Sequence, residues 1–119
     1  MTRFIISLHA SPWSHQSVLT AVQFAQTAIK RGNQVGAVFL YQDAVLNASP
    51  SLDISSDELN GQTHLLQLHE QHGVPLMLCV TAAEKRGLVA DNIKAGFKLA
   101  GLAELAELST ETDKLVQFK

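Results

Sequence analysis

The sequence predicts an α/β fold with a single domain over residues 1–119, in which a parallel sheet of about five strands has helices on both faces, giving three layers. Two observations lead to this fold class. Short apolar runs typical of strands alternate with helical patterns through the whole chain. These runs contain few polar residues, as expected for parallel strands that are covered on both faces. We find no internal repeat or linker that would separate a second domain.

The first part of the chain predicts two strands with a helix between them. Residues 4–8 and residues 34–41 are compact apolar runs suited to central strands. The intervening segment has apolar residues at three- and four-residue spacing, and either Ser11 or Ser14 can cap its start. Gly32 follows the last helical residues and suits a left-handed helix cap.

The segment that follows the second strand is polar and has no clear period. It covers residues 43–56, which is long for a connection in this class, where most run about 2–6 residues. We therefore expect it to form a rim of a binding site. Ser55 and Glu58 match a capping box and predict the start of a helix that stops at Gly73.

The only cysteine, Cys79, lies where a buried strand changes into a helix. Residues 74–80 predict the third strand. Thr81 and Glu84 match a second capping box, which predicts a short helix over residues 82–86. Residues 97–99 then indicate a brief fourth strand, residues 102–108 a helical stripe, and residues 115–118 a closing strand, in that order.

A thiol just before a helix start has two interpretations. The free N–H groups and the positive end of the helix dipole favour the thiolate, which is the nucleophilic form, and Lys85 and Arg86 add positive charge nearby. Alternatively, Cys79 is one more buried core residue, since free cysteine behaves as a small hydrophobe. In parallel sheets, reactive groups collect at the carboxyl ends of strands, which here also carry residues 9–11 and 41–43.

Composition narrows the classes of function. The net charge of −2 and the pI of about 6.2 argue against direct binding of nucleic acid. With 46% hydrophobic and 17% charged residues, the composition favours burial in subunit interfaces. The N-terminal apolar run is too short for a signal peptide and no segment is long enough to span a membrane, so a reduced, cytoplasmic protein is expected.

Other familiar chemistries have little support. Neither type of glycine-rich phosphate loop occurs, and no cofactor is predicted. His69 and His72 share a helix face from which His64 points away, and without a thiol or acidic partner we expect a solvated face and no metal site. A cysteine hydrolase would need a base beside the thiol, and His9, His15 and His72 are indistinguishable candidates.

The chain resembles the DsrE/TusD family of sulfurtransferase subunits. The most specific match is a cysteine between an apolar strand and a helix that ends in arginine and glycine, here Cys79, Ala82, Ala83, Arg86 and Gly87. The resemblance extends over nearly the full chain, through the segments HQSVLTAVQFAQTAIKRGNQVGAVFLYQDAVLNAS at 15–49, QLHEQHGVPLMLCVTAAEKRG at 67–87 and GFKLAGLAELAELSTETDKLVQF at 96–118.

This resemblance implies a DsrE-like fold of the Rossmann or flavodoxin type and a sulfurtransferase activity. It implies that Cys79 carries sulfur as a persulfide, taken from a small TusA-like donor and passed to a TusE-like acceptor. The TusD branch implies 2-thiouridine synthesis in tRNA, and the DsrE branch implies dissimilatory sulfur oxidation. The family also implies a hexamer with DsrF/TusC-like and DsrH/TusB-like subunits, although the sequence leaves hetero- and homo-oligomers open.

Two segments depart from the family pattern. Residues 88–95 form a shorter connection than we expect between Gly87 and Gly96, so a loop near the thiol is trimmed. The first loop reads ASPWSHQS in place of a glycine-proline-tyrosine sequence, so no family role is carried over to it. We expect residues 43–56 and 88–95 to form the rims of the thiol site.

The leading hypothesis is a sulfur relay in which Cys79 is the catalytic thiol and Thr81, Lys85 and Arg86 support it. One rival is a noncatalytic assembly subunit in which Cys79 is buried. A module that binds a small molecule or nucleotide is the third interpretation.

Overall fold

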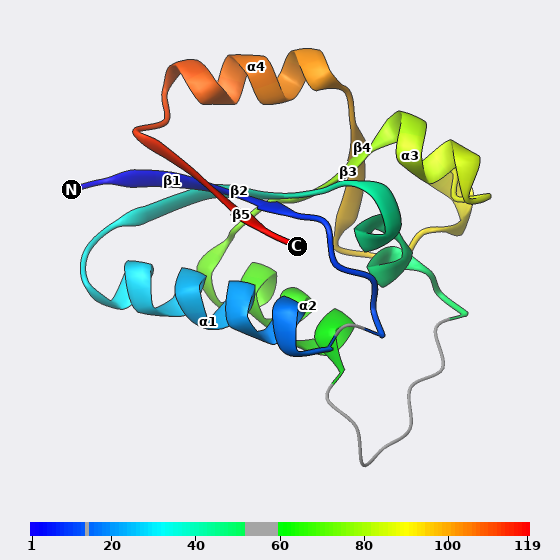
Figure 1. Ribbon diagram of the computed structural model, residues 1–119, viewed down its shortest axis with the longest axis horizontal. Coiled ribbons are helices and arrows are strands. Elements are labelled where there is room, and N and C mark those ends of the chain that lie inside the picture. The colour runs from blue at the N-terminus through cyan, green and yellow to red at the C-terminus, as the bar shows by residue number, and fades with distance from the viewer. Residues whose placement is uncertain (14, 52–59) are drawn as a thin grey trace.

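Five parallel strands form a single sheet in the computed structural model, which describes residues 1–13, 15–51 and 60–119 (Figure 1). They lie in the order β4-β3-β2-β1-β5, and each neighbouring pair is parallel. The predicted fold class is confirmed. The strands are β1 (Arg3–Leu8), β2 (Gln34–Leu40), β3 (Leu76–Cys79), β4 (Phe97–Ala100) and β5 (Lys114–Phe118).

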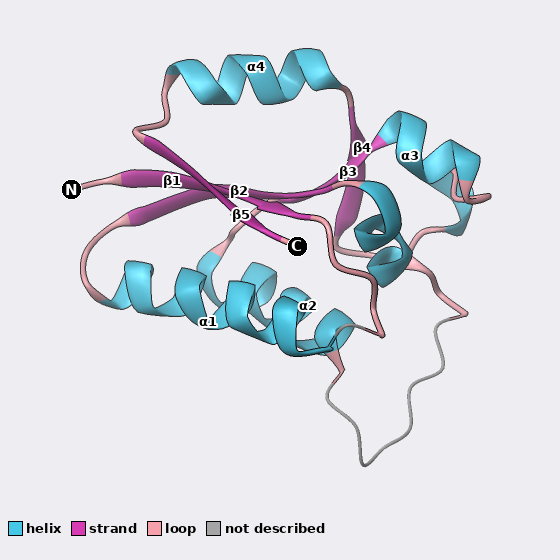
Figure 2. Ribbon diagram, in the orientation of Figure 1, coloured by secondary structure: helices cyan, strands magenta, loops and turns pink. Residues whose placement is uncertain are grey.

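Helices cover both faces of this sheet (Figure 2). Two of them, α1 (His15–Lys30) and α2 (Gly61–His72), lie on one face, and α4 (Leu102–Thr110) lies on the other. The short α3 (Val80–Lys85) follows β3 without a loop. Two 3₁₀ helices, η1 (Gln42–Ala48) and η2 (Ala90–Asn92), complete the described elements. None of the helices in the described ranges has both the length and the apolar character needed to cross a membrane.

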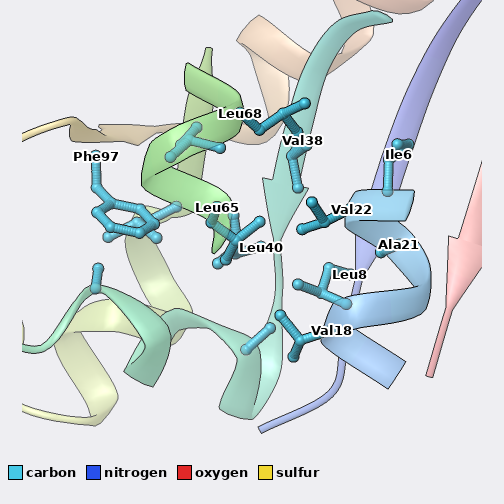
Figure 3. Close-up of a cluster of buried hydrophobic side chains, with 14 of the residues drawn as sticks. Ile6, Leu8, Val18, Ala21, Val22, Val38, Leu40, Leu65, Leu68 and Phe97 are labelled. Atoms are coloured by element: carbon cyan, nitrogen blue, oxygen red, sulfur yellow. The ribbon is translucent and has the colours of Figure 1, made fainter. Parts of the chain in front are cut away.

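The main core fills the space between the sheet and the α1–α2 layer (Figure 3). Side chains alternate between the two faces of a strand, so every second residue of β1, β2 and β3 points into this layer. Burying these branched apolar side chains removes them from water and is the main favourable term in folding. The labelled members are Ile6, Leu8, Val18, Ala21, Val22, Val38, Leu40, Leu65, Leu68 and Phe97.

A smaller cluster occupies the other face of the sheet, under α4. Its buried members are Ala37, Phe39, Met77, Cys79 and Ala100. Leu105 and Leu108 of α4 pack against it, but no residue of α4 is itself buried. The thiol therefore belongs to the thinner of the two apolar layers.

Residues 42–48 correct one prediction, because they form η1 and not an irregular loop. The sequence pattern misses this element because a 3₁₀ helix has a different period and runs for only two turns. Four of its residues are buried, and Asn47 Nδ2 donates hydrogen bonds to the carbonyls of Ala44 (2.9 Å) and Ala10 (3.4 Å). The predicted capping box at Ser55 and Glu58 lies outside the described residues.

The two ends of α2 are set by an asparagine and a glycine. The Asn60 side chain accepts a hydrogen bond from the Thr63 N–H at 3.1 Å and caps the start. Gly73 takes the left-handed conformation (φ 67°) and ends the helix where the sequence predicted. At Gly61 a Cβ atom would lie 2.5 Å from Val18 Cγ1, so glycine is required where α2 approaches α1.

The order of the strands reverses between β1 and β5. The chain builds the sheet outward from β1 through β2 and β3 to β4, and then returns to place β5 on the other side of β1. The backbone of His9 continues this pairing, since its N–H donates to the Phe118 carbonyl at 2.8 Å. Cys79, on β3, is two strands away from the reversal.

Two leucines in different surroundings should differ in how much their substitution by alanine lowers the free energy of unfolding. Leu65 is fully buried in the main core, so Leu65→Ala should lower the free energy of unfolding by about 2–5 kcal/mol. Leu102 is 61% exposed, so Leu102→Ala should change it by less than about 0.5 kcal/mol. Urea unfolding of both variants measures the difference, and equal destabilisation would contradict this description of the core.

Candidate active site

Cys79 occupies the junction between β3 and α3. It is the last residue of the strand and the N-cap residue of the helix, with φ −59° and ψ 117°. Its exposed fraction is 8%, so only a small part of the residue meets solvent. The first-turn N–H groups of α3 have no partners within the helix, and such groups favour an anion at this position.

Thr81 does not cap α3, which corrects the predicted capping box. The helix begins at Val80, one residue after the strand ends, so Thr81 is its second residue and is exposed. No side-chain hydrogen bond caps the helix. The absence of a connecting loop is the physical reason, because it shifts the start of the helix to the cysteine itself.

A cavity of about 380 Å³ opens beside the thiol. All four residues predicted for the site, Cys79, Thr81, Lys85 and Arg86, lie in its wall, so the fold brings them together. The other four lining residues are Tyr41, Gln42, Ala82 and Leu102. The sequence placed residues 41–43 at the carboxyl end of a strand and Ala82 in the cysteine motif, but it could not show that they meet at this cavity, because that depends on the pairing of β2 with β3.

Arg86 is held in place from two sides. Its Nε donates to Asp43 Oδ1 at 3.0 Å and its Nη1 donates to the Ala82 carbonyl at 3.0 Å. The ion pair is partly exposed and therefore contributes little to stability. Its structural effect is to connect α3 to η1, which orients the guanidinium at the edge of the cavity. Lys85 is exposed on the same wall.

The residues that border the thiol cavity in the structure differ from those that the sequence predicted. Residues 88–95 are not among the described residues that line the cavity, and the described part of the predicted segment, residues 43–51, takes part through Asp43, which holds Arg86. The neighbouring Gln42 lines the cavity with a positive φ of 48°, a conformation that side-chain-bearing residues rarely adopt. The rest of the rim comes from Leu102 at the start of α4.

Tyr41 joins the thiol to two other aromatic rings. It packs against Phe39 with ring centroids 4.7 Å apart and stacks on His9 at 5.2 Å with an interplanar angle of 22°. Burial raises the pKa of the Tyr41 phenol above its ordinary value, and the charge of Cys79 raises it further. The phenol is therefore protonated at neutral pH and is a hydrogen-bond donor.

His69 and His72 lie away from the thiol cavity. The His69 ring contacts the Val74 carbonyl through Nδ1 at 2.9 Å, and His72 borders a separate cavity of about 460 Å³ at the amino ends of the strands. The side chain of His15 is outside the described part of the structure. Within that part, no three histidine, cysteine or carboxylate side chains are grouped to hold a metal ion.

Comparison with known proteins identifies the fold and the family. The sequence model of the DsrE/DsrF-like family matches residues 2–118. The chain belongs to this family. A curated relative, sulfurtransferase TusD of Erwinia tasmaniensis, is 39% identical over 127 positions that cover 98% of this chain and 99% of the relative. The aligned length exceeds that of this chain, so the relative contains insertions.

Two solved structures share the DsrE/DsrF-like fold. The YchN protein of E. coli superposes with a TM-score of 0.83 and 24% identity, covering 99% of this chain and all of the other. A protein of unknown function from Methanobacterium thermoautotrophicum has a TM-score of 0.72 and 16% identity, covering 98% and 99%. At these identities the structures establish the fold alone.

The pKa of Tyr41 should report the charge of its neighbour. In Cys79→Ser the negative sulfur is removed, so the pKa of the phenol should fall toward 10.0 while staying above it because the burial persists. Tyr41 is the only tyrosine, so the ultraviolet absorbance of phenolate follows it alone during a pH titration. An unchanged titration curve would show that the two side chains do not interact.

Proposed function

We propose that this protein is a sulfur-carrier subunit that holds sulfane sulfur as a persulfide on Cys79. The observation that carries the proposal is the cavity of about 380 Å³ that joins the only cysteine to Lys85 and Arg86 at a helix start. Full-length similarity to a sulfurtransferase supports it. In this proposal Cys79 is the catalytic residue, and Thr81, Lys85 and Arg86 form the wall against which the sulfur donor docks.

The transfer needs no external oxidant or reductant. The Cys79 thiolate attacks the terminal sulfur of a donor persulfide, a new S–S bond forms, and the donor's S–S bond breaks to release its thiolate. An acceptor thiolate then attacks the terminal sulfur on Cys79 in the same way, which restores the Cys79 thiolate. Each step exchanges one S–S bond for another, so the oxidation state of the pair is conserved.

The cationic side of the cavity suits this chemistry. The attacking thiolate and the departing thiolate of each step are anions, and Lys85 and the oriented Arg86 lie beside the sulfur where that charge passes. No histidine base is required, because a thiolate is already the nucleophile. A partner's cysteine must reach the thiol, and the cavity provides the opening.

We assign the donor to the TusA-like carriers and the acceptor to the TusE-like proteins, with tRNA 2-thiouridine as the product served. The relative named TusD supports this branch. We further propose assembly with DsrF/TusC-like and DsrH/TusB-like subunits in a hexamer. Leu102 (61% exposed) and Leu115 (53% exposed) are large apolar residues that such an assembly would cover.

The burial of Cys79 favours a second candidate, a noncatalytic assembly subunit. An exposed fraction of 8% is what a core cysteine would show, and the residue packs in an apolar cluster with Phe39 and Met77. In that case the cavity would be an ordinary surface hollow. The two candidates differ in whether the native thiol reacts.

The relay predicts that Cys79 gains the mass of one sulfur atom when the purified protein is mixed with a persulfidated TusA-like carrier. Intact-protein mass spectrometry measures the gain, and Cys79→Ser should show none because its hydroxyl cannot form a persulfide. The carrier alone and the reduced carrier are the controls. An equal gain in Cys79→Ser would contradict the assignment of the site.

The relay also predicts that the native thiol is accessible. Alkylation of the folded protein by iodoacetamide at neutral pH should be within about tenfold of the rate measured after denaturation, because the cavity admits a small reagent. The assembly-subunit candidate predicts that alkylation occurs only after unfolding. Thermal unfolding at the same pH confirms that the first measurement concerns the folded state.

A further inference from the structure

The carboxyl ends of three neighbouring strands place a line of side chains that leads to the thiol. His9 follows β1, Tyr41 follows β2, and Cys79 ends β3, and these strands are adjacent in the sheet. The rings of His9 and Tyr41 stack, and Tyr41 shares a cavity wall with Cys79. Figure 1 shows this end of the sheet beside α3. Neither ring is required by the main core, which lies under the other face.

His9 is itself anchored by polar contacts. Its Nε2 lies 3.0 Å from Ser7 Oγ and 2.9 Å from Gln117 Nε2. Ser7 is 3% exposed on β1, and Gln117 extends from β5, so the ring is held from both sides of the strand-order reversal. When the Gln117 amide donates to Nε2, the proton of the neutral imidazole is on Nδ1. The stack therefore places Tyr41 against a fixed ring.

We propose that the Tyr41 hydroxyl is a hydrogen-bond donor to the anionic sulfur of Cys79, and that His9 is a positioning residue that orients the Tyr41 ring. The proposed hydrogen bond to the Cys79 thiolate does not depend on which reaction Cys79 performs. Its extension to the persulfide rests on the proposed relay, in which the negative charge moves to the terminal sulfur. There Tyr41 stabilises both the loaded and the unloaded carrier.

The Tyr41 hydroxyl suits the role of a hydrogen-bond donor to the sulfur and not that of an acid. Because its pKa is raised, the phenol stays protonated, so the hydroxyl can stabilise an anion without giving up its proton. A hydrogen bond to a charged group is stronger than one between neutral groups. In a partly buried site, where water cannot fully solvate the sulfur, such a donor replaces part of the lost hydration.

Other charged groups near the thiol also influence its reactivity, so the test must separate their effect from that of the Tyr41 hydroxyl. Lys85 and Arg86 of α3 line the cavity, and Asp43 of η1 offsets part of the Arg86 charge. Glu104 and Glu107 of α4 border a neighbouring hollow with Met77. These charges are unchanged in a Tyr41→Phe variant, which keeps the ring and removes only the hydroxyl.

The first experiment is the alkylation of Cys79 by iodoacetamide as a function of pH in wild type and Tyr41→Phe. Losing the donor should move the midpoint of the rate profile upward by about one pH unit. The limiting rate at high pH should rise about threefold, because an unbonded thiolate is more nucleophilic. Alkylation thus becomes slower at neutral pH and faster at high pH, which distinguishes a lost hydrogen bond from a loosened fold, and coincident profiles would overturn the proposal for Tyr41.

The second experiment tests His9 with a double-mutant cycle. His9→Ala should move the midpoint in the same direction as Tyr41→Phe and add nothing in the Tyr41→Phe background, because its effect passes through the hydroxyl. His9→Phe should restore part of the change by restoring the stack. His64→Ala, a histidine of α2 outside the site, is the matched control. Additive effects of His9→Ala and Tyr41→Phe would overturn the positioning role.

Persulfide loading of the same variants separates this inference from the proposed function. If wild type accepts sulfur and Tyr41→Phe loads about threefold more slowly at neutral pH, because the thiolate fraction falls about tenfold while the thiolate itself reacts about threefold faster, the donor also acts in the relay. If wild type accepts sulfur and Tyr41→Phe loads at the same rate, the extension to the relay is overturned. If wild type accepts no sulfur, the proposed function fails, and the alkylation profiles still decide the hydrogen bond.

Discussion

The pairing of β3 between β2 and β4 is the constraint on which the candidate site depends. The register sets Met77 opposite Phe39 and Lys98, and Cys79 opposite Ala100. Because side chains alternate, this register points Cys79 to the face covered by α4, away from the main core. A shift by one residue would direct the thiol into the α1–α2 layer. The ladder of backbone hydrogen bonds therefore decides which side of the sheet carries the chemistry.

The same parallel arrangement explains why the site is assembled from distant segments. Parallel strands end at one edge of a sheet, so residues that follow β1, β2 and β3 meet there although long segments separate them in sequence. Tyr41 follows β2, whereas Cys79 ends β3 and Arg86 follows the short α3 that continues from it. The edge therefore brings an aromatic ring from the end of one strand to a thiol and a cation at the end of the next.

Much of this arrangement could be predicted from the sequence because strand and helix patterns are local. The apolar runs and the glycines at 32 and 73 located most elements, and the lone cysteine in its motif located the site. The start of α3 was misplaced because a capping box at Thr81 looks the same whether or not a loop precedes it. The contacts of Tyr41 with His9 and of Arg86 with Asp43 could not be predicted, since they depend on strand order.

The position of β5 beside β1 has a consequence for the way the protein folds. β1, β2, β3 and β4 pair in the order in which they occur, and each of these pairings closes one crossover connection. The contact between His9 and Gln117 instead spans 108 residues, and closing so long a loop costs more entropy than closing one crossover, so we expect it to form after them. The anchor of the ring beside Tyr41 therefore depends on the last strand of the chain, whereas the pairing of the thiol strand with β2 and β4 does not.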